Sequence, residues 1–128
     1  MSRVRDKNTK PELLVRRFLH GQGFRYRLHV KDLPGKPDLV LPKYKTVIFV
    51  HGCFWHGHEN CKKAALPQTR TEWWQNKIGS NKANDIKHSA ALQKAGWTVL
   101  VVWECDLATT KINDTLNEIA QKLTSPVR

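Results

Sequence analysis

Apolar positions recur at helical spacing over residues 9–20, which predicts an amphipathic helix near the start of the chain. The segment opens with Thr-Lys-Pro-Glu, a capping box in which Thr9 and Glu12 satisfy each other's backbone donors. Gly21 supplies the stop. One face of the helix is expected to pack on a sheet while its basic residues face solvent, with the apolar stripe formed by Leu14, Val15, Phe18 and Leu19.

Three strand-like segments follow this helix. Residues 24–28 alternate in polarity, and residues 38–41 and 46–50 are apolar and rich in β-branched side chains. The Leu-Pro-Gly-Lys-Pro segment at 33–37 is a predicted turn, because two prolines and a glycine exclude regular structure there. The short connection at 42–45 makes the last two strands neighbours in a buried sheet.

The second half of the chain alternates an irregular loop with further regular elements. Residues 51–70 are rich in His, Cys, Gly and Pro and need something to hold them in place. Two helices are predicted at 71–78 and 81–94, then the most apolar strand at 97–103. A last helix buries a stripe of Ile112, Leu116, Ile119 and Leu123.

This order predicts an α/β sandwich with one central mixed sheet flanked by helices. The 128 residues fit one domain, spanning 1–128, in which residues 1–8 form an N-terminal arm. No segment is long and apolar enough to span a membrane, and the N-terminus has no apolar core of a signal peptide. We therefore expect a cytoplasmic protein.

The charge balance narrows the class of partner. The chain has 22 Lys and Arg against 11 Asp and Glu, a formal net charge of +11. Such an excess on a small protein favours a polyanionic partner, and nucleic acid is the best candidate. The alternatives are that the charge only aids solubility or that the protein meets an anionic membrane.

Three cysteines and one histidine predict a structural metal site. Cys53, His58, Cys61 and Cys105 offer three thiolates and one imidazole, a tetrahedral set that suits Zn²⁺ and leaves no position open for catalysis. The ion would join the irregular loop to the end of the strand at 97–103. The alternative is a set of ordinary buried cysteines, which are common in protein cores.

A second group of residues suits hydrolysis of a phosphodiester. Asp38 begins one predicted strand and the next strand runs into His51, so both lie at neighbouring strand ends. Asp38 could hold Mg²⁺, with the backbone oxygen of Val50 completing its shell. His51 and His56 are candidates to activate the attacking water. Each residue also has an ordinary structural explanation when taken alone.

Two interpretations of Glu12 are open, one structural and one functional. The capping box explains it as a structural residue, whereas a helix packed over the sheet could also bring its carboxylate towards the waters of a metal ion.

Aromatic side chains in polar surroundings are candidates for DNA contacts. Phe54 and Trp55 stand between the predicted zinc ligands, where a base step would provide an apolar surface for a wedge. Trp73 and Trp74 face different directions on a helix, so we expect Trp73 in the core and Trp74 beside the wedge. The alternative for all of these is packing within the protein.

Basic residues such as Lys36 and Arg70 would contact phosphates.

Three blocks of sequence closely resemble the very short patch repair (Vsr) endonucleases. They are LPGKPDLVLPKYKTVIFVHGCFWHGH, TRTEWWQNKIGSN and GWTVLVVWEC, and the resemblance runs from about Asn8 to Cys105. It implies a restriction-endonuclease-like fold of the PD-(D/E)XK type, a structural Zn²⁺, and a Mg²⁺-dependent nick 5′ to the thymine of a T:G mismatch.

The resemblance also assigns residues. Asp38 matches the metal-binding aspartate, His51 and His56 match the active-site histidines, and Glu12 matches the helical glutamate. The zinc ligands match Cys53, His58, Cys61 and Cys105, and the wedge aromatics match Phe54, Trp55 and Trp74.

The chain departs from the family pattern at three places. Val50 stands where the family pattern has a threonine before the first histidine. A role of the backbone carbonyl is preserved, but the side-chain hydroxyl is absent. One additional residue separates His58 from Cys61, and only Met1 to Val4 are available for an N-terminal wedge.

The predicted function is therefore mismatch nicking in very short patch repair of deaminated 5-methylcytosine. We expect a monomer associated with the nucleoid, with double-stranded DNA and repair-system proteins as partners. The alternatives are a related nuclease that cuts intact or branched DNA, and a zinc-stabilised DNA-binding module without catalysis.

Overall fold

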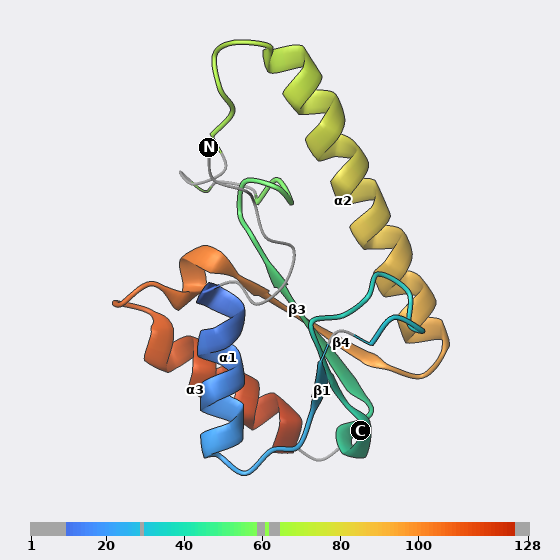
Figure 1. Ribbon diagram of the computed structural model, residues 1–128, viewed down its shortest axis with the longest axis vertical. Coiled ribbons are helices and arrows are strands. Elements are labelled where there is room, and N and C mark those ends of the chain that lie inside the picture. Colours follow the sequence, from blue (N-terminus) through green and yellow to red (C-terminus); the bar gives the residue numbers. More distant parts are fainter. Residues whose placement is uncertain (1–9, 29, 59–60, 62–64, 125–128) are drawn as a thin grey trace.

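The computed structural model describes residues 10–28, 30–58, 61 and 65–124 (Figure 1). In chain order the elements are α1 (Lys10–Gly21), β1 (Arg27–Leu28), β2 (Leu39–Leu41), the 3₁₀ turn η1 (Pro42–Tyr44), β3 (Thr46–His51), α2 (Thr71–Lys94), β4 (Thr98–Trp103), the 3₁₀ turn η3 (Glu104–Leu107) and α3 (Ile112–Thr124).

The strands form one mixed sheet in the order β1-β2-β3-β4. β1, β2 and β3 pair antiparallel, whereas β3 and β4 pair parallel in a register that runs from Thr46 beside Thr98 to His51 beside Trp103. The parallel pair therefore delivers His51 and Trp103 to the same end of the sheet. The α/β class and the mixed sheet predicted from the sequence are confirmed.

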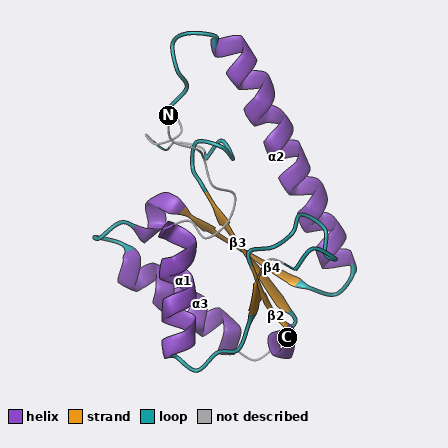
Figure 2. Ribbon diagram, in the orientation of Figure 1, coloured by secondary structure: helices purple, strands orange, loops and turns teal. Residues whose placement is uncertain are grey.

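Helices cover both faces of the sheet (Figure 2). α1 and α3 lie on one face, where their apolar stripes meet alternate side chains of the strands in the larger core: Val15, Leu19, Leu39, Leu41, Ile48, Leu116, Ile119 and Leu123. The other face packs a smaller core against α2, built from Val40, Val47, Phe49 and Leu92. Central strands buried on both faces explain the uninterrupted apolar runs of β2 and β3.

The two helices predicted at 71–78 and 81–94 are one continuous helix, so that prediction was wrong. The gap between the two predicted helices contains Gly79 and Ser80, but α2 continues through both, since a glycine in a helix interior costs only about 1 kcal/mol relative to alanine. Only Ile78 and Leu92 are buried on α2, whose upper half extends past the sheet in Figure 1. The long helix therefore carries polar side chains over much of its surface.

Two strands also differ from the sequence pattern. β1 has only two residues, against the five predicted at 24–28. β4 is an edge strand in the described sheet, so its apolar character does not produce full burial and Val101 is 40% exposed.

Thr9 and the arm at 1–8 lie outside the described residues, so the capping box and the arm stay predictions.

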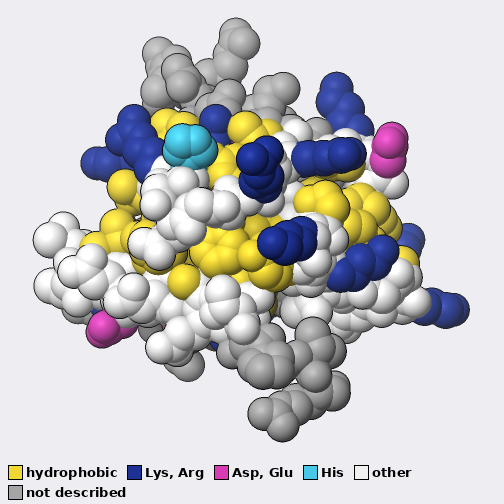
Figure 3. All heavy atoms as spheres, turned by 90° about the horizontal axis from the view of Figure 1, so that it is seen from below, with side chains coloured by type: hydrophobic (Ala, Val, Ile, Leu, Met, Phe, Trp, Pro, Cys, Tyr) yellow, Lys and Arg dark blue, Asp and Glu magenta, His cyan; other side chains and the backbone are white. Residues whose placement is uncertain are grey.

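Basic side chains are spread over the surface, as the net charge of the chain predicts; Figure 3 shows them on the face at the bottom of Figure 1. No helix within the described ranges combines the length and the hydropathy that a bilayer crossing requires.

Candidate active site and metal centre

Asp38 lies at the end of the sheet where β3 finishes. Its Oδ2 accepts a hydrogen bond of 2.7 Å from the backbone N–H of Val50, so the carboxylate is fixed beside the last residues of β3. The side chain is half-buried and follows a fully buried proline. The antiparallel pairing of β2 with β3 explains this placement, because Leu39 pairs with Ile48. A negative charge held at this edge can serve a cation or a proton transfer.

His51, His56 and Asp85 form a compact cluster next to this carboxylate. The two imidazole rings are stacked, with centroids 3.8 Å apart and planes 3° apart. His56 Nδ1 lies 2.6 Å from Asp85 Oδ2. One ligand atom from each of the three residues lies within 4.8 Å of the others, so the cluster could also hold a metal ion.

His51 is buried in a way that keeps it neutral. Only 7% of the residue is exposed, and its Nδ1 has no hydrogen-bond partner within the described part of the chain. The pKa of His51 is lowered from 6.5 to about 4, chiefly by burial and also by the positive charge of His56, while Asp85 partly opposes both effects. At neutral pH His51 is therefore an uncharged imidazole with an unsatisfied nitrogen, an arrangement more typical of functional sites than of cores.

Cys53, His58, Cys61 and Cys105 come together as predicted. One ligand atom from each residue lies within 4.8 Å of the others. Cys105 Sγ is 3.4 Å from His58 Nδ1, and the backbone N–H of Cys105 donates to Cys53 Sγ at 3.4 Å. The three cysteines are free thiols. This donor set fits a soft tetrahedral cation, because three sulfur atoms and an imidazole converge at one point.

The thiols resist ionisation in the protein alone. Burial raises the pKa of Cys53 to about 12, although a backbone hydrogen bond from Cys105 opposes the shift, and burial also raises the pKa of Cys105. A bound cation would reverse this preference, so metal binding would release protons here.

The loop that follows β3 carries His56 as well as Cys53 and His58, and it also packs against α2. Gly57 has φ of +61°, and a Cβ there would lie 2.6 Å from Ile78 Cγ2 and 2.8 Å from Lys82 Cδ. Asn81 Nδ2 donates to the carbonyl oxygen of Trp55 at 2.8 Å. Contacts with α2 therefore hold this loop in addition to the metal that the sequence predicts.

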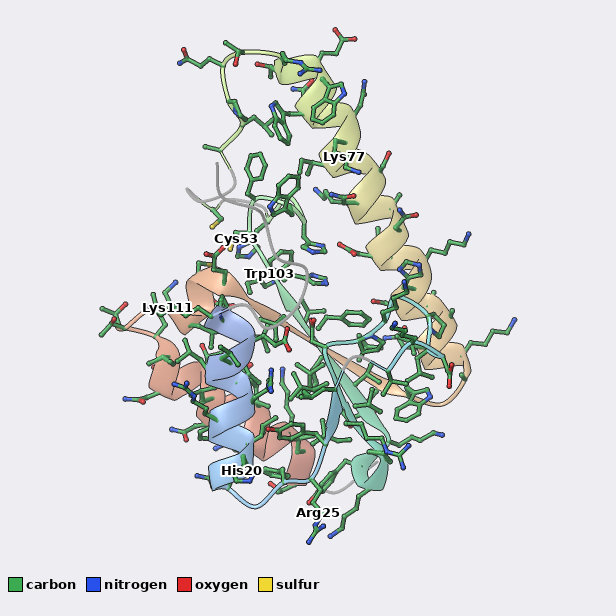
Figure 4. All side chains as sticks on the ribbon, in the orientation of Figure 1. His20, Arg25, Cys53, Lys77, Trp103 and Lys111 are labelled. Atoms are coloured by element: carbon green, nitrogen blue, oxygen red, sulfur yellow. The ribbon has the colours of Figure 1, made fainter. Side chains whose placement is uncertain are left out.

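Trp103 lies between the thiol cluster and the histidine pair. Its ring is stacked on His58 with centroids 4.1 Å apart, and it meets the His51 ring edge-on at 5.2 Å. Figure 4 shows Trp103 and Cys53 close together, away from His20 and Arg25 at the bottom of the view. The two clusters are therefore in contact through one aromatic ring.

An aromatic cluster joins the loop after β3 to helix α2. The rings of Phe54, Trp55 and Trp74 lie with centroids between 5.1 and 5.7 Å apart, all edge-on, and all three side chains are half-buried. The expectation that Trp73 packs in the core was wrong. Trp73 is 47% exposed, meets Trp74 edge-on at 4.8 Å and lies under Arg70, because this part of α2 extends past the sheet.

Two hollows flank the histidine cluster. One, of about 260 Å³, is lined by Asp38 and Val50 and reaches Lys36, which has φ of +50°. The other, of about 620 Å³, lies between α2 and β4. His51, His56 and Asp85 line both.

Glu12 lines neither hollow. It is 2% exposed in the first turn of α1, where its Oε2 lies 3.6 Å from Arg16 Nη1. Its link to a metal ion stays a prediction.

Sequence reasoning missed the contribution of α2 to this site. Asp85, His88 and Ser89 line the smaller hollow together with Asp38. The available signal was an aspartate one helical turn before a histidine, but i,i+3 pairs of this kind are common on solvated helices.

Comparison with known proteins identifies relatives of this chain. Residues 1–63 match the family model described as DNA mismatch endonuclease Vsr. The chain is also 45% identical over 107 residues to the DNA mismatch endonuclease Vsr of Escherichia coli K12, an alignment that covers 84% of this chain and 68% of that protein.

This chain belongs to the Vsr family of DNA mismatch endonucleases. Other Vsr-like relatives carry the name of type II nicking enzymes. V.NmeAIP of Neisseria meningitidis serogroup A is 48% identical over 128 residues, covering 99% of this chain and 91% of that protein. V.XorIIP of Xanthomonas oryzae pv. oryzae is 54% identical over 108 residues, covering 84% and 79%. Membership of the Vsr family makes this protein a nuclease that acts on DNA.

Gly57→Ala is expected to lower the free energy of unfolding by about 1–3 kcal/mol, because the new Cβ meets Ile78 and the residue must keep a left-handed conformation. Urea denaturation followed by circular dichroism measures the change. Gly79→Ala is the control: it lies in helix α2 with no atom within 4 Å and should add about 0.5–1 kcal/mol. Equal effects of the two substitutions would contradict the close packing of Gly57 on α2.

The burial of His51 predicts a pH dependence of stability. Its folded pKa of about 4 lies below its unfolded value of 6.5, so its contribution is complete above pH 6.5 and is lost as the pH falls towards 4. Between about pH 8 and about pH 5 the wild type should lose about 2 kcal/mol that a His51→Asn variant does not lose. Urea midpoints of both proteins at the two pH values test this, and parallel curves would show that His51 is not held neutral by the fold.

Proposed function

We propose that this protein nicks one strand of duplex DNA 5′ to the thymine of a T:G mismatch, in very short patch repair of deaminated 5-methylcytosine. The observation that carries the proposal is the Asp38 carboxylate beside the His51, His56 and Asp85 cluster, in a Vsr-family chain with an aromatic cluster next to that site. Double-stranded DNA is the substrate in this proposal.

The histidine cluster is suited to proton transfer. With Asp85 as acceptor, His56 carries its proton on Nδ1 and presents Nε2 as the base that takes a proton from the attacking water. His51 stacks on that ring as a neutral imidazole and can donate or accept a hydrogen bond at the phosphate. The two histidines named from the sequence thereby receive different roles.

Asp38 and the carbonyl oxygen of Val50 would hold Mg²⁺. Carboxylate, carbonyl and phosphate oxygens form the shell that Mg²⁺ prefers, and when bound the ion polarises the scissile phosphate and stabilises the leaving oxygen. The hydrogen bond from the Val50 N–H orients the Asp38 carboxylate for this task before DNA arrives. Val50 contributes only backbone atoms, so a valine at this position is acceptable.

The thiol cluster is proposed to hold a structural Zn²⁺. Cys53, His58 and Cys61 belong to one irregular loop and Cys105 follows β4, so an ion would join the loop to the sheet. This join keeps His56, which lies in the same loop, in place beside Asp85.

Phe54, Trp55 and Trp74 are proposed to enter the DNA at the mismatch. A mismatched step costs less to unstack than a paired one, so a wedge of rings gains selectivity there. Lys36 and Arg70 stand in backbone conformations that non-glycine residues rarely adopt, at the smaller hollow and at the start of α2, and are proposed phosphate contacts.

We also infer a restriction-endonuclease-like architecture of the PD-(D/E)XK type. Pro37 and Asp38 immediately precede β2, and the adjacent strand β3 ends at the same edge of the sheet in His51, where the usual motif has an acidic residue and a lysine. In this interpretation His51 and His56 replace the usual second half of the motif.

The function is tested with a labelled duplex that contains a single T:G mismatch, beside its T:A control, with Mg²⁺ and with EDTA. A Mg²⁺-dependent nick confined to the strand of the mismatched thymine is expected. Equal cutting of both duplexes would replace the proposal with a nuclease for intact DNA, and binding without any cutting would replace it with a non-catalytic module.

Asp38→Asn should lower the nicking rate about a thousandfold or more, because the amide keeps an acceptor for Val50 but removes the charge that serves the cation. Single-turnover nicking of the T:G duplex measures the loss, and an unchanged urea midpoint shows that the fold is intact. Asp32→Asn, at an exposed site, should retain full activity. Full activity of Asp38→Asn would remove the proposed metal site.

Cys105→Ala and His58→Ala should each release zinc and destabilise the domain, because each removes one ligand of a closed site. Elemental analysis of the purified proteins and thermal unfolding give the two measurements. His20→Ala, which alters an exposed histidine of α1, should change neither. Absence of zinc from the wild type, with an unchanged melting temperature in both variants, would overturn the structural role.

A further inference from the structure

A second group of charges lies at the end of the sheet opposite to the histidine cluster. Here the chain passes between α1 and β1, between β2 and β3, and between α2 and β4. We define the distal face by four exposed side chains from these connections and the start of β1: Arg25, Arg27, Lys43 and Lys45. Figure 4 places Arg25 at this end and Cys53 and Trp103 at the other.

The positive charges of the distal face have no acidic residues in the segments that form it. The segments 20–28, 42–46 and 94–98 contain Arg25, Arg27, Lys43, Lys45 and Lys94 but neither aspartate nor glutamate. Figure 3 looks at this face and shows Lys and Arg side chains across it, with acidic side chains only towards its margin. No ion pair in the described part of the chain takes up the charges of the four residues.

Part of this charge is held in place by aromatic rings. Lys45 Nζ lies 4.4 Å from the centroid of the Trp97 ring, and Lys43 Nζ lies 5.7 Å from that of Tyr44. The carbonyl oxygen of Lys45 accepts from the Thr98 N–H at 2.8 Å, which fixes the turn. Beside Arg25 the surface forms a hollow of about 550 Å³. Two of the ammonium groups on the distal face therefore make cation–π contacts with aromatic rings of the same surface.

DNA bound at the histidine cluster does not reach this face. β3 runs from the distal face to His51 over six residues, which corresponds to about 16–20 Å. A duplex is stiff over about 150 base pairs, so a short segment that lies across the histidine end of the sheet does not wrap round to the opposite end. The distal face needs a partner of its own.

We propose that the distal face binds the sugar-phosphate backbone of a second duplex DNA segment. Positive charge without acidic neighbours suits a continuous polyanion, whereas protein interfaces are built around a buried apolar centre with mixed charges at the rim. Figure 3 shows apolar side chains on this face with Lys and Arg between them, and Lys43 and Lys45 lie over the rings of Tyr44 and Trp97, so the apolar surface here is interrupted by positive charge. A protein with DNA at both ends passes between neighbouring segments without complete release.

This inference goes beyond mismatch nicking and requires only that the protein acts on DNA. It is tested by sedimentation velocity with excess intact duplex of about 12 base pairs, little more than one helical turn, in EDTA. The wild type should form complexes of one protein with two duplexes at about 50 mM salt and lose the second duplex at about 200 mM.

The variant Arg25→Gln/Lys43→Gln should bind the second duplex at least about tenfold more weakly, while it nicks a short T:G duplex at the wild-type rate. The matched control Lys111→Gln/Lys122→Gln removes two exposed charges near α3 and should bind two duplexes like the wild type. The proposal would be overturned if the wild type binds only one duplex at low salt. It would also be overturned if Arg25→Gln/Lys43→Gln binds the second duplex as tightly as the wild type.

Labelled poly-glutamate serves as the probe for an acidic protein partner. If the wild type binds it at the distal face but takes up only one duplex, the proposal of a DNA partner is wrong. If the wild type binds two duplexes but does not nick the T:G duplex, the proposed function is rejected and this inference stands.

Discussion

The parallel pairing of β3 with β4 is the constraint on which the site depends. Its register places His51 beside Trp103, and two residues further along each chain segment come Cys53 and Cys105. One set of backbone hydrogen bonds therefore aligns the histidine pair and the thiol cluster together. A shift of this register by one residue would turn every β4 side chain to the opposite face and separate both clusters, so the apolar packing of the sheet indirectly protects the chemistry.

The buried His51 shows how the fold accommodates a group that opposes its stability. An imidazole with an unsatisfied nitrogen is unfavourable in a core. The surrounding aromatic and sheet packing holds it there nonetheless, stacked on His56 and edge-on to Trp103. Asp85 contacts His56, whereas His51 Nδ1 has no hydrogen-bond partner among the described residues, and burial lowers the pKa of His51.

Sequence patterns predicted the strands and the donor sets better than the long helix. Asp38 and the four thiol-cluster residues could be found because strand ends and closely spaced cysteines are local signals. Asp85 could not, since its role depends on how α2 crosses the sheet, which no local pattern encodes. The predictions of two separate helices and of a buried Trp73 were both wrong. In the part of α2 that extends beyond the sheet, Gly79 does not end the helix and Trp73 has no core to pack against.

The continuity of α2 has a geometric consequence. The same helix holds Trp74 in the aromatic cluster and Asp85 against His56, eleven positions further along the chain. At the rise of an α-helix the two side chains are separated by about 16 Å along one rigid axis. In the proposed function, α2 would therefore set the distance between the point where the rings enter the base stack and the point where the strand is cut. The position of the cut relative to the disturbed base step would then be fixed by the length of helix between Trp74 and Asp85.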